Sequence, residues 1–288
     1  MNSVISKIVI GTAQFGLKYG INNKTGRISE NEVKQILNFA SLQNIFFLDT
    51  SPLYGNSEEV IGNCLSEISG KFNIVSKLPD CDKSEVKDLF FKSLSMLKSK
   101  KIYGYLFHHY SGFINQVSNY YELNELKEKG LIKKIGFSLY HTSELDYLLK
   151  NGYHFDIVQF PYSVFDQRFS EYLPILKDKN IEVFVRSIFL QGLVFKDPNE
   201  LTYPLSKLSN KINLLRQLCI KKKISIANLC LSFIIENNCI DKVILGVDNI
   251  DQFKELVSVK LLKMDDALRK ELIELKENNE KLILPINW

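Results

Sequence analysis

Cysteine and histidine are scarce in this sequence, which has 5 and 4 of them, respectively, among 288 residues. The cysteines form no Cys-x-x-Cys pair, their number is odd, and they lie at positions 64, 81, 219, 230 and 239. This pattern excludes a zinc-finger framework and a disulfide-stapled scaffold. We therefore expect reduced thiols, a cytoplasmic location and no bound metal.

Long apolar runs and a strong excess of one charge are also absent. No apolar stretch approaches 18 residues, and the first ten residues are too broken to form a signal peptide. The 37 Lys and Arg residues nearly balance the 33 Asp and Glu residues, and no basic stripe with interleaved aromatic residues stands out. We expect neither a membrane nor a nucleic-acid partner, and the sequence carries no indication of the oligomeric state.

Short apolar runs alternate with longer amphipathic stretches along the whole chain. The apolar runs predict strands at 7–10, 45–48, 73–76, 103–107, 134–138, 156–160, 181–185 and 242–247. The amphipathic stretches predict helices at 30–42, 57–67, 83–98, 114–129, 142–150, 167–179, 205–220, 226–236, 251–259 and 265–276. Such alternation is typical of a parallel sheet, and strands that are apolar throughout indicate burial on both faces. Eight units in 288 residues favour a single-domain α/β fold over residues 1–288. We predict a (β/α)8 TIM barrel at about 7–260, followed by a C-terminal helix and tail.

Residues typical of helix ends support these predicted positions of the strands and helices. Ser29 followed by Glu32 predicts a capping box at the first helix, and Lys129-Gly130 predicts the end of the fourth. The segment 190–204 contains glycine and proline and is the longest stretch without a predicted helix. We expect a mobile loop there, placed over a site.

Polar residues stand where three predicted strands end. Asp49 follows the second strand, Lys77 the third and His108 the fourth, and turn residues after Asp49 can bring Tyr54 back over the barrel. Catalytic residues of such barrels lie at these strand ends. Taken singly, an aspartate can cap a helix, a lysine can be a surface charge and a histidine can be structural. Buried opposite charges must pair, so we expect Asp49 and Lys77 to lie together. With Tyr54 and His108 they form a set of groups that can hold and transfer protons.

The same residues carry a resemblance to a known family. Asp-Thr-Ser-Pro-Leu-Tyr-Gly-x-Ser-Glu at 49–58, continued by Ile61-Gly62, resembles the Asp-Thr-Ala-x-x-Tyr-Gly-x-Ser-Glu segment of the aldo-keto reductases, here of a bacterial branch. Lys77 and His108 are similar to the lysine and histidine of the family, and Gly11-Thr12 to its opening dipeptide. The resemblance covers about residues 7–259.

This resemblance implies an NAD(P)H-dependent oxidoreductase that reduces an aldehyde or ketone, with carbohydrates as one candidate class, to an alcohol. Tyr54 would be the general acid, and Lys77 would lower the pKa of its hydroxyl. Asp49 would orient Lys77, and His108 would orient the carbonyl. The substrate would be lined by Phe15, Tyr19, Tyr54, His108 and His109.

The resemblance also assigns contacts to the cofactor, at Gly11, Thr12, Asp49, Ser138, Gln159, Arg186, Ser187, Leu190, Gly192, Gly246, Gln252 and Glu255. Ser138 and Gln159 would hold the carboxamide, and Arg186 takes the place of the aromatic platform for the nicotinamide. No Gly-x-Gly-x-x-Gly follows a strand, so a Rossmann site is not predicted.

Gly246 and Gln252 stand where the family often has a lysine and an arginine for the 2′-phosphate of NADP, and Asp248 and Asp251 are close by. These residues weaken the case for a phosphate. The usual partner of the family nevertheless leads us to expect NADP (NADPH) in preference to NAD.

Two other functions are open at this point. The chain could be a non-catalytic NADPH-binding subunit that senses redox state. It could also be a barrel lyase or epimerase in which Lys77 forms a Schiff base.

Overall fold

The computed structural model describes residues 3–21, 23 and 26–288 of the chain. Eight parallel strands form a closed barrel: β1 (Ile8–Gly11), β2 (Phe47–Asp49), β3 (Asn73–Leu78), β4 (Ile102–Phe107), β5 (Ile132–Ser138), β6 (Ile157–Pro161), β7 (Glu182–Arg186) and β8 (Lys242–Gly246). Each strand pairs with the next, and β8 closes the barrel by pairing in parallel with β1. The predicted (β/α)8 fold is confirmed.

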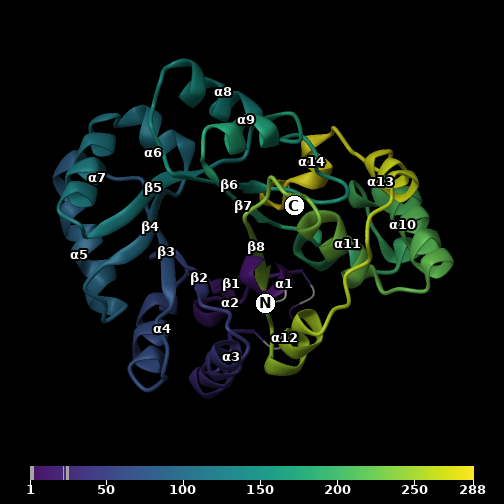
Figure 1. Ribbon diagram of the computed structural model, residues 1–288, viewed down its shortest axis with the longest axis horizontal. Coiled ribbons are helices and arrows are strands. Elements are labelled where there is room, and N and C mark those ends of the chain that lie inside the picture. The colour runs from purple at the N-terminus through teal and green to yellow at the C-terminus, as the bar shows by residue number, and fades with distance from the viewer. Residues whose placement is uncertain (1–2, 22, 24–25) are drawn as a thin grey trace.

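Helices surround this barrel. They are α1 (Ser3–Lys7), α2 (Ala13–Gly16), α3 (Glu30–Leu42), α4 (Ser57–Leu65), α5 (Val86–Met96), α6 (Tyr110–Asn115), α7 (Ser118–Glu128), α8 (Thr142–Lys150), α9 (Tyr172–Asp178), α10 (Ser209–Lys222), α11 (Ile226–Ile235), α12 (Ile250–Val257), α13 (Asp266–Ile273) and α14 (Glu280–Ile283). Figure 1 shows the strands at the centre, with α5 and α7 on one side and α10 and α13 on the other. No helix in the described part of the chain is both long and apolar enough to cross a bilayer.

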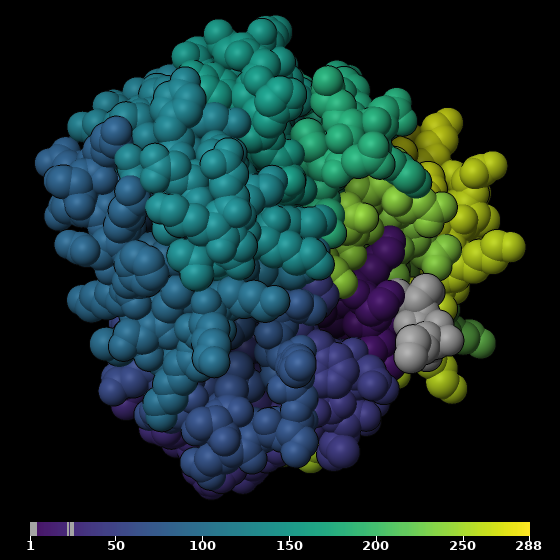
Figure 2. Space-filling view, turned by 60° about the vertical axis from the view of Figure 1, so that its left-hand side comes forward, coloured from purple at the N-terminus to yellow at the C-terminus, as the bar shows by residue number. Residues whose placement is uncertain are grey.

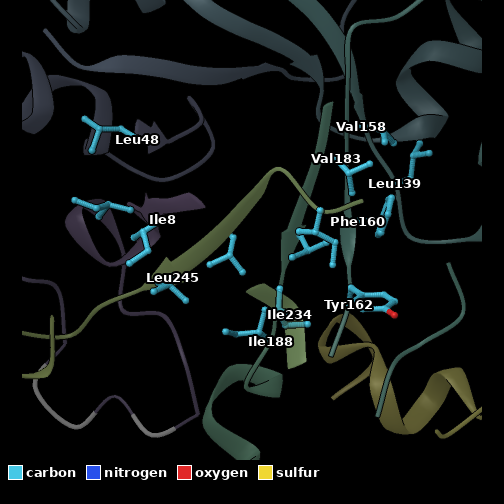
Figure 3. Close-up of a cluster of buried hydrophobic side chains, with 14 of the residues drawn as sticks. Ile8, Leu48, Leu139, Val158, Phe160, Tyr162, Val183, Ile188, Ile234 and Leu245 are labelled. Atoms are coloured by element: carbon cyan, nitrogen blue, oxygen red, sulfur yellow. The ribbon is translucent and has the colours of Figure 1, made fainter. Parts of the chain in front are cut away.

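Apolar side chains fill both sides of the barrel wall. A small cluster inside the barrel consists of Val9, Val75, Leu106, Ile157, Phe184 and Ile244, which come from six different strands. A much larger cluster lies between the outer face of the strands and the helices. Figure 3 shows part of it, where side chains of β6 and β7 lie close to Ile234 of α11. Burial on both faces explains why the strands read as continuous apolar runs.

Some predicted helices are divided in the structure. Short 3-10 turns precede two of them, as η1 (Lys83–Glu85) before α5 and η4 (Leu205–Leu208) before α10. The stretch 114–129 is split where Gln116 leaves the helical region between α6 and α7, with φ −137° and ψ 66°. The apolar period continues across such breaks, so the pattern alone predicts one helix.

The segment 190–204 is not the helix-free loop that we expected. It contains η2 (Leu190–Phe195) and η3 (Pro198–Glu200), and it packs Leu193 and Val194 into the core. The helix predicted from residue 167 begins at Tyr172. The residues before it form tight turns instead, in which the Ser170 N–H donates to the Gln167 carbonyl oxygen and the Tyr172 N–H donates to the Phe169 carbonyl oxygen.

The two capping predictions have different outcomes. Gly130, at φ +72°, follows the end of α7 as predicted. Ser29 caps α3 by accepting the Glu32 N–H at 3.3 Å. The Glu32 carboxylate, however, accepts the Ile250 N–H at the start of α12, at 3.1 Å, so it serves a second helix.

Gly62 of α4 lies against the end of α5. A Cβ atom at this position would overlap the Met96 carbonyl oxygen and lie 2.9 Å from the Leu97 carbonyl carbon. Replacing a helical glycine by alanine normally stabilises a helix by about 0.5–1 kcal/mol. Here the backbone of α5 must move away, and this displacement outweighs the gain in propensity.

We therefore expect Gly62→Ala to lower the free energy of unfolding by about 1–3 kcal/mol in urea titrations. The matched control is Glu59→Ala, an exposed position of the same helix, which should change it by less than about 0.5 kcal/mol. Equal or greater stability of Gly62→Ala would contradict the packing described for α4 and α5.

Candidate active site

Four polar residues meet at the C-terminal end of the barrel. Asp49 is the last residue of β2, Lys77 lies at the end of β3, His108 directly follows β4, and Tyr54 lies in the loop between β2 and α4. A pocket of about 290 Å³ opens beside Asp49, Tyr54 and His108. Figure 2 shows the purple first part of the chain recessed between the teal segments and the yellow-green C-terminal third.

Lys77 is the centre of this arrangement. Its side chain is fully buried, and its ammonium group donates to Asp49 Oδ2 at 2.8 Å and to the Thr50 carbonyl oxygen at 2.9 Å. The third contact is the hydroxyl oxygen of Tyr54, at 3.4 Å. The three hydrogens of the ammonium therefore have three oxygen acceptors, which is the condition for burying such a charge.

The charges of the site set its protonation states. Burial alone would lower the pKa of Lys77, but Asp49 and Tyr54 more than offset it, so the pKa of Lys77 is raised. Burial raises the pKa of Tyr54, and the nearby charge of Lys77 only partly opposes this. Lys77 therefore acts on the pKa of Tyr54 in the expected direction, but desolvation is the larger effect and the net pKa is raised.

His108 is held by a residue that the sequence analysis did not single out. The hydroxyl oxygen of Ser51 lies 2.9 Å from His108 Nδ1 and also accepts the Leu53 N–H at 3.0 Å. Burial and the charges of Lys77, His109 and Arg186 lower the pKa of His108 to about 2, so the imidazole is neutral at pH 7. Ser51 thus holds Nδ1 and leaves Nε2 for a substrate. The family segment has an alanine where this chain has Ser51. This difference is the feature of the sequence that could have identified Ser51 as a site residue.

Backbone contacts fix the loop that carries Tyr54. Thr12 donates its hydroxyl to the Asp49 carbonyl oxygen at 2.9 Å, and Ser57 donates to the Thr12 carbonyl oxygen at 3.0 Å. Gly16 lies so close that a Cβ atom there would overlap the Tyr54 carbonyl oxygen. The position of the tyrosine is therefore set by β1 and α2, which explains why Gly11-Thr12 belongs to the motif.

Two residues predicted to hold a carboxamide lie on neighbouring strands. Ser138 and Gln159 are both buried and pair directly between β5 and β6. The side-chain Nε2 of Gln159 donates to Asp49 Oδ1 at 2.7 Å. The side-chain Oε1 of Gln159 is buried and has no hydrogen-bond partner in the described part of the chain. A buried acceptor of this kind is costly until a donor arrives. An amide NH2 group of a bound nicotinamide fits this requirement.

The turn after β7 is strained. Ser187, Leu190, Gln191 and Gly192 all have φ between 46° and 92°. Non-glycine residues in this region cost about 1–3 kcal/mol each and cluster at ligand clamps. Ser187, Gln191 and Gly192 line the pocket, and Gln191 donates to the Tyr19 hydroxyl oxygen across it at 3.0 Å.

Arg186 occupies the rim between this turn and the tetrad. Its guanidinium lies 4.2 Å from the centre of the Tyr140 ring and donates to the Leu139 carbonyl oxygen at 3.2 Å. A guanidinium can stack on planar rings. The sequence analysis missed Tyr140, which forms a second layer behind Arg186.

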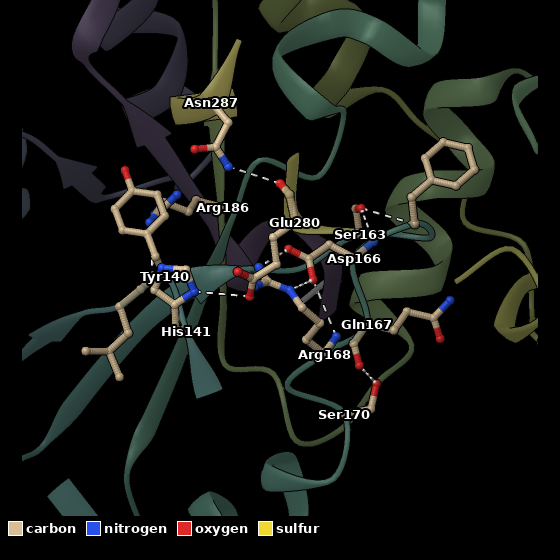
Figure 4. A network of polar contacts seen from close by, with 12 residues as sticks. Tyr140, His141, Ser163, Asp166, Gln167, Arg168, Ser170, Arg186, Glu280 and Asn287 are labelled. Carbon is tan, nitrogen blue, oxygen red and sulfur yellow. Dashed lines mark hydrogen bonds and ion pairs between the residues drawn. The ribbon is translucent and has the colours of Figure 1, made fainter. Parts of the chain in front are cut away.

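A polar network ties the C-terminal segment to the same rim (Figure 4). Glu280 of α14 contacts Arg168 and lies 3.1 Å from His141 Nδ1. Arg168 in turn donates to both carboxylate oxygens of the buried Asp166 at 2.8 Å. The loops after β5 and β6 are thereby held together by a residue from the end of the chain.

The structure does not bring all predicted site residues to the pocket. Those that line it are Gly11, Thr12, Tyr19, Asp49, Tyr54, His108, Arg186, Ser187, Gly192, Gly246 and Gln252. Ser138, Gln159 and Leu190 are buried beside the pocket and do not line it, and Glu255 lies exposed one turn beyond Gln252. Phe15 is fully buried in the core, which corrects the expectation that it lines the substrate site. His109 stacks on His108 but points to Asp80, outside the lining.

In residues 3–21, 23 and 26–288, no group of three or more His, Cys, Asp or Glu side chains could hold an ion. The described cysteines are all free thiols.

Comparisons with known proteins identify the family of the chain. Residues 7–277 match the model of the Aldo/keto reductase family. The chain is 24% identical over 273 residues to the uncharacterized oxidoreductase YqkF of Bacillus subtilis, covering 85% of this chain and 88% of that protein. It is 26% identical over 277 residues to the NADH-specific methylglyoxal reductase of Escherichia coli, covering 81% and 85%.

Solved structures share the fold. The holo form of the aldo-keto reductase AKR11C1 from Bacillus halodurans has a TM-score of 0.78 at 20% identity and covers 94% of this chain and 92% of its own. The glycerol dehydrogenase AKR11B4 from Gluconobacter oxydans has a TM-score of 0.74 at 17% identity, with 96% and 92% covered. With its closed barrel and the family model over residues 7–277, this chain belongs to the aldo/keto reductase family.

Proposed function

We propose that the protein reduces an aldehyde or ketone to an alcohol, with Tyr54 as the general acid. Membership of the family makes it an NAD(P)H-dependent oxidoreductase. The observation that carries the proposal is the contact between the Tyr54 hydroxyl and the buried Lys77 ammonium, which Asp49 holds in place.

The chemistry follows from the charges that appear during reduction. The nicotinamide cofactor, when bound, would supply the hydride for the carbonyl carbon, and negative charge would then develop on the carbonyl oxygen of the substrate. Tyr54 is protonated at neutral pH because its pKa is raised, so it can donate its proton to that oxygen. The phenolate left behind would lie beside the buried Lys77 ammonium, whose charge would stabilise it.

His108 has a different role from Tyr54. We propose that the Ser51 hydroxyl donates to Nδ1 of the neutral imidazole, 2.9 Å away, so that the ring carries its hydrogen on Nε2 and can donate it to the carbonyl oxygen. We propose that His108 orients the substrate in this way and that it does not supply the proton.

The residues at the pocket also fit the cofactor that the family requires. Ser138 and the unpaired carbonyl oxygen of Gln159 would hold the carboxamide, and the strained turn at 187–192 would close over the molecule. Arg186, stacked on Tyr140, would support the nicotinamide face. The family resemblance predicts NADPH in preference to NADH. The Escherichia coli relative is named NADH-specific, which supports the opposite preference here.

The proposed substrate is a small carbonyl compound. Tyr19, Tyr54, Tyr140 and Arg186 line the accessible part of the pocket. Sugar rings stack on aromatic side chains, so a carbohydrate remains one candidate class. The cytoplasmic location expected from the free thiols also stays a prediction.

A Schiff-base mechanism at Lys77 is disfavoured. A nucleophilic amine must be neutral, and the pKa of Lys77 is raised by the two groups that it contacts. Its nitrogen is fully buried and all three of its hydrogens point to oxygen acceptors.

Removing the proposed acid tests the assignment. Tyr54→Phe should lower kcat for reduction of a reactive aldehyde by about 10²–10⁴-fold, because positioned proton transfer is lost. Its affinity for the reduced cofactor, measured by fluorescence titration, should stay close to that of the wild type. Tyr121→Phe, at an exposed tyrosine remote from the pocket, is the control and should keep full activity. A Tyr54→Phe enzyme that turns over at the wild-type rate would overturn the proposal.

The protonation states predict the pH dependence. His108 stays neutral above about pH 2, and Tyr54 stays protonated until the pH exceeds the usual tyrosine value. We therefore expect kcat for reduction, at saturating cofactor and substrate, to be constant between about pH 6 and 9 and to fall only at higher pH. A loss of activity as the pH falls through about 6.5, the ordinary histidine value, would show that His108 titrates in this range.

A further inference from the structure

We propose that Asp248 makes the protein select NADH over NADPH, by binding a ribose whose hydroxyl groups are free. The inference rests on the proposed function, because it concerns the cofactor pocket of that function. The reacting ring must lie beside Tyr54, so the remote part of the dinucleotide occupies the other end of the same pocket. That end is formed by Gly246, Asp248 and Gln252, at the end of β8 and the start of α12.

Asp248 presents an acceptor without a partner. Its Oδ1 atom is buried and has no hydrogen-bond partner in the part of the chain that the structure describes. Its Oδ2 atom lies 3.5 Å from Gln252 Nε2, and its N–H donates to Gln252 Oε1 at 2.6 Å. A buried carboxylate oxygen in this state requires a donor. A ribose hydroxyl supplies one, whereas a phosphate offers acceptor oxygens and charge of the same sign.

The start of α12 offers little to a phosphate. Helix N-termini bind phosphates through free N–H groups. Here the Ile250 N–H donates to the carboxylate of Glu32 at 3.1 Å, and the Gln252 N–H donates to Asn249 Oδ1 at 2.8 Å. The Asp248 N–H donates to the side-chain oxygen of Gln252. These donors are therefore occupied by the chain's own side chains, and one of the acceptors is itself a carboxylate.

Positive charge is also missing at this end. In the described part of the lining, the one Lys or Arg side chain is Arg186, which is stacked on Tyr140 at the β7 rim. A longer side chain at position 246 would meet Gln14, because even a Cβ atom at Gly246 would lie 2.9 Å from Gln14 Nε2. A 2′-phosphate, which carries about −1.5 to −2 charges at pH 7, would meet Asp248 with no Lys or Arg side chain among the described lining residues at this end.

The test is a direct comparison of binding. Dissociation constants of NADH and NADPH are measured by fluorescence titration of the full chain, without substrate. The wild type should bind NADH at least about tenfold more tightly than NADPH, the size expected for one hydrogen bond to a charged group. Asp248→Ser should weaken NADH binding and bring the ratio of the two constants close to one.

Asp251→Asn is the matched control. It removes a charge of the same sign three residues further along the chain, in the first turn of α12, but Asp251 is exposed, pairs with Lys254 and does not line the pocket. It should leave the ratio unchanged within about twofold, because exposed charges are screened.

The possible failures are distinguishable. Equal or tighter binding of NADPH by the wild type would overturn the selectivity while leaving the proposed function intact. A preference for NADH that persists in Asp248→Ser would overturn the assignment to Asp248. Binding of neither cofactor would instead contradict the proposed function itself.

Discussion

The buried ion pair between Lys77 and Asp49 is the interaction on which the site depends. Two charges at the ends of β2 and β3 are removed from water, and such a pair is tolerated only when every donor and acceptor is satisfied. The other partners of the two charges are Gln159, which donates to Asp49, and Thr50 and Tyr54, whose oxygens contact the Lys77 ammonium. The same contacts that make the burial tolerable place a phenol hydroxyl next to a fixed ammonium. The structural requirement and the proposed chemistry are therefore met by one arrangement.

The barrel makes this arrangement possible because parallel strands end at the same rim. Residues far apart in the chain, such as Asp49 and Gln159, come within hydrogen-bonding distance there. The rim also extends to β8, where the charge is of the opposite sign to that of Lys77. In the mechanism that we propose, one end of the pocket would stabilise negative charge that develops during reduction, and the other end, at Asp248, would disfavour a permanent negative charge on the ligand. The proposed catalysis and the proposed cofactor selection thus use the same electrostatic principle with opposite sign.

Much of this could be predicted from the sequence, and the limits have physical reasons. Buried parallel strands are apolar throughout, so all eight were found, and α3 was predicted with the bounds that the structure has. Asp49, Lys77 and His108 follow such strands and were therefore recognisable. Contacts between distant segments leave no local pattern, which is why the Glu32–Ile250 and Ser51–His108 pairs were missed. Phe15 was misplaced because an aromatic residue near a strand end serves equally in a core or in a pocket.

The central claim is that Lys77 acts through Tyr54, and a double-mutant cycle on the hydride-transfer rate tests it most directly. Lys77→Met, Tyr54→Phe and the double variant are compared in single-turnover experiments with pre-bound reduced cofactor. Groups that work as a unit give losses that are far from additive. The account predicts that the double variant is about as slow as Tyr54→Phe alone. Losses that simply multiply would show that the two residues act independently, and they would contradict the account.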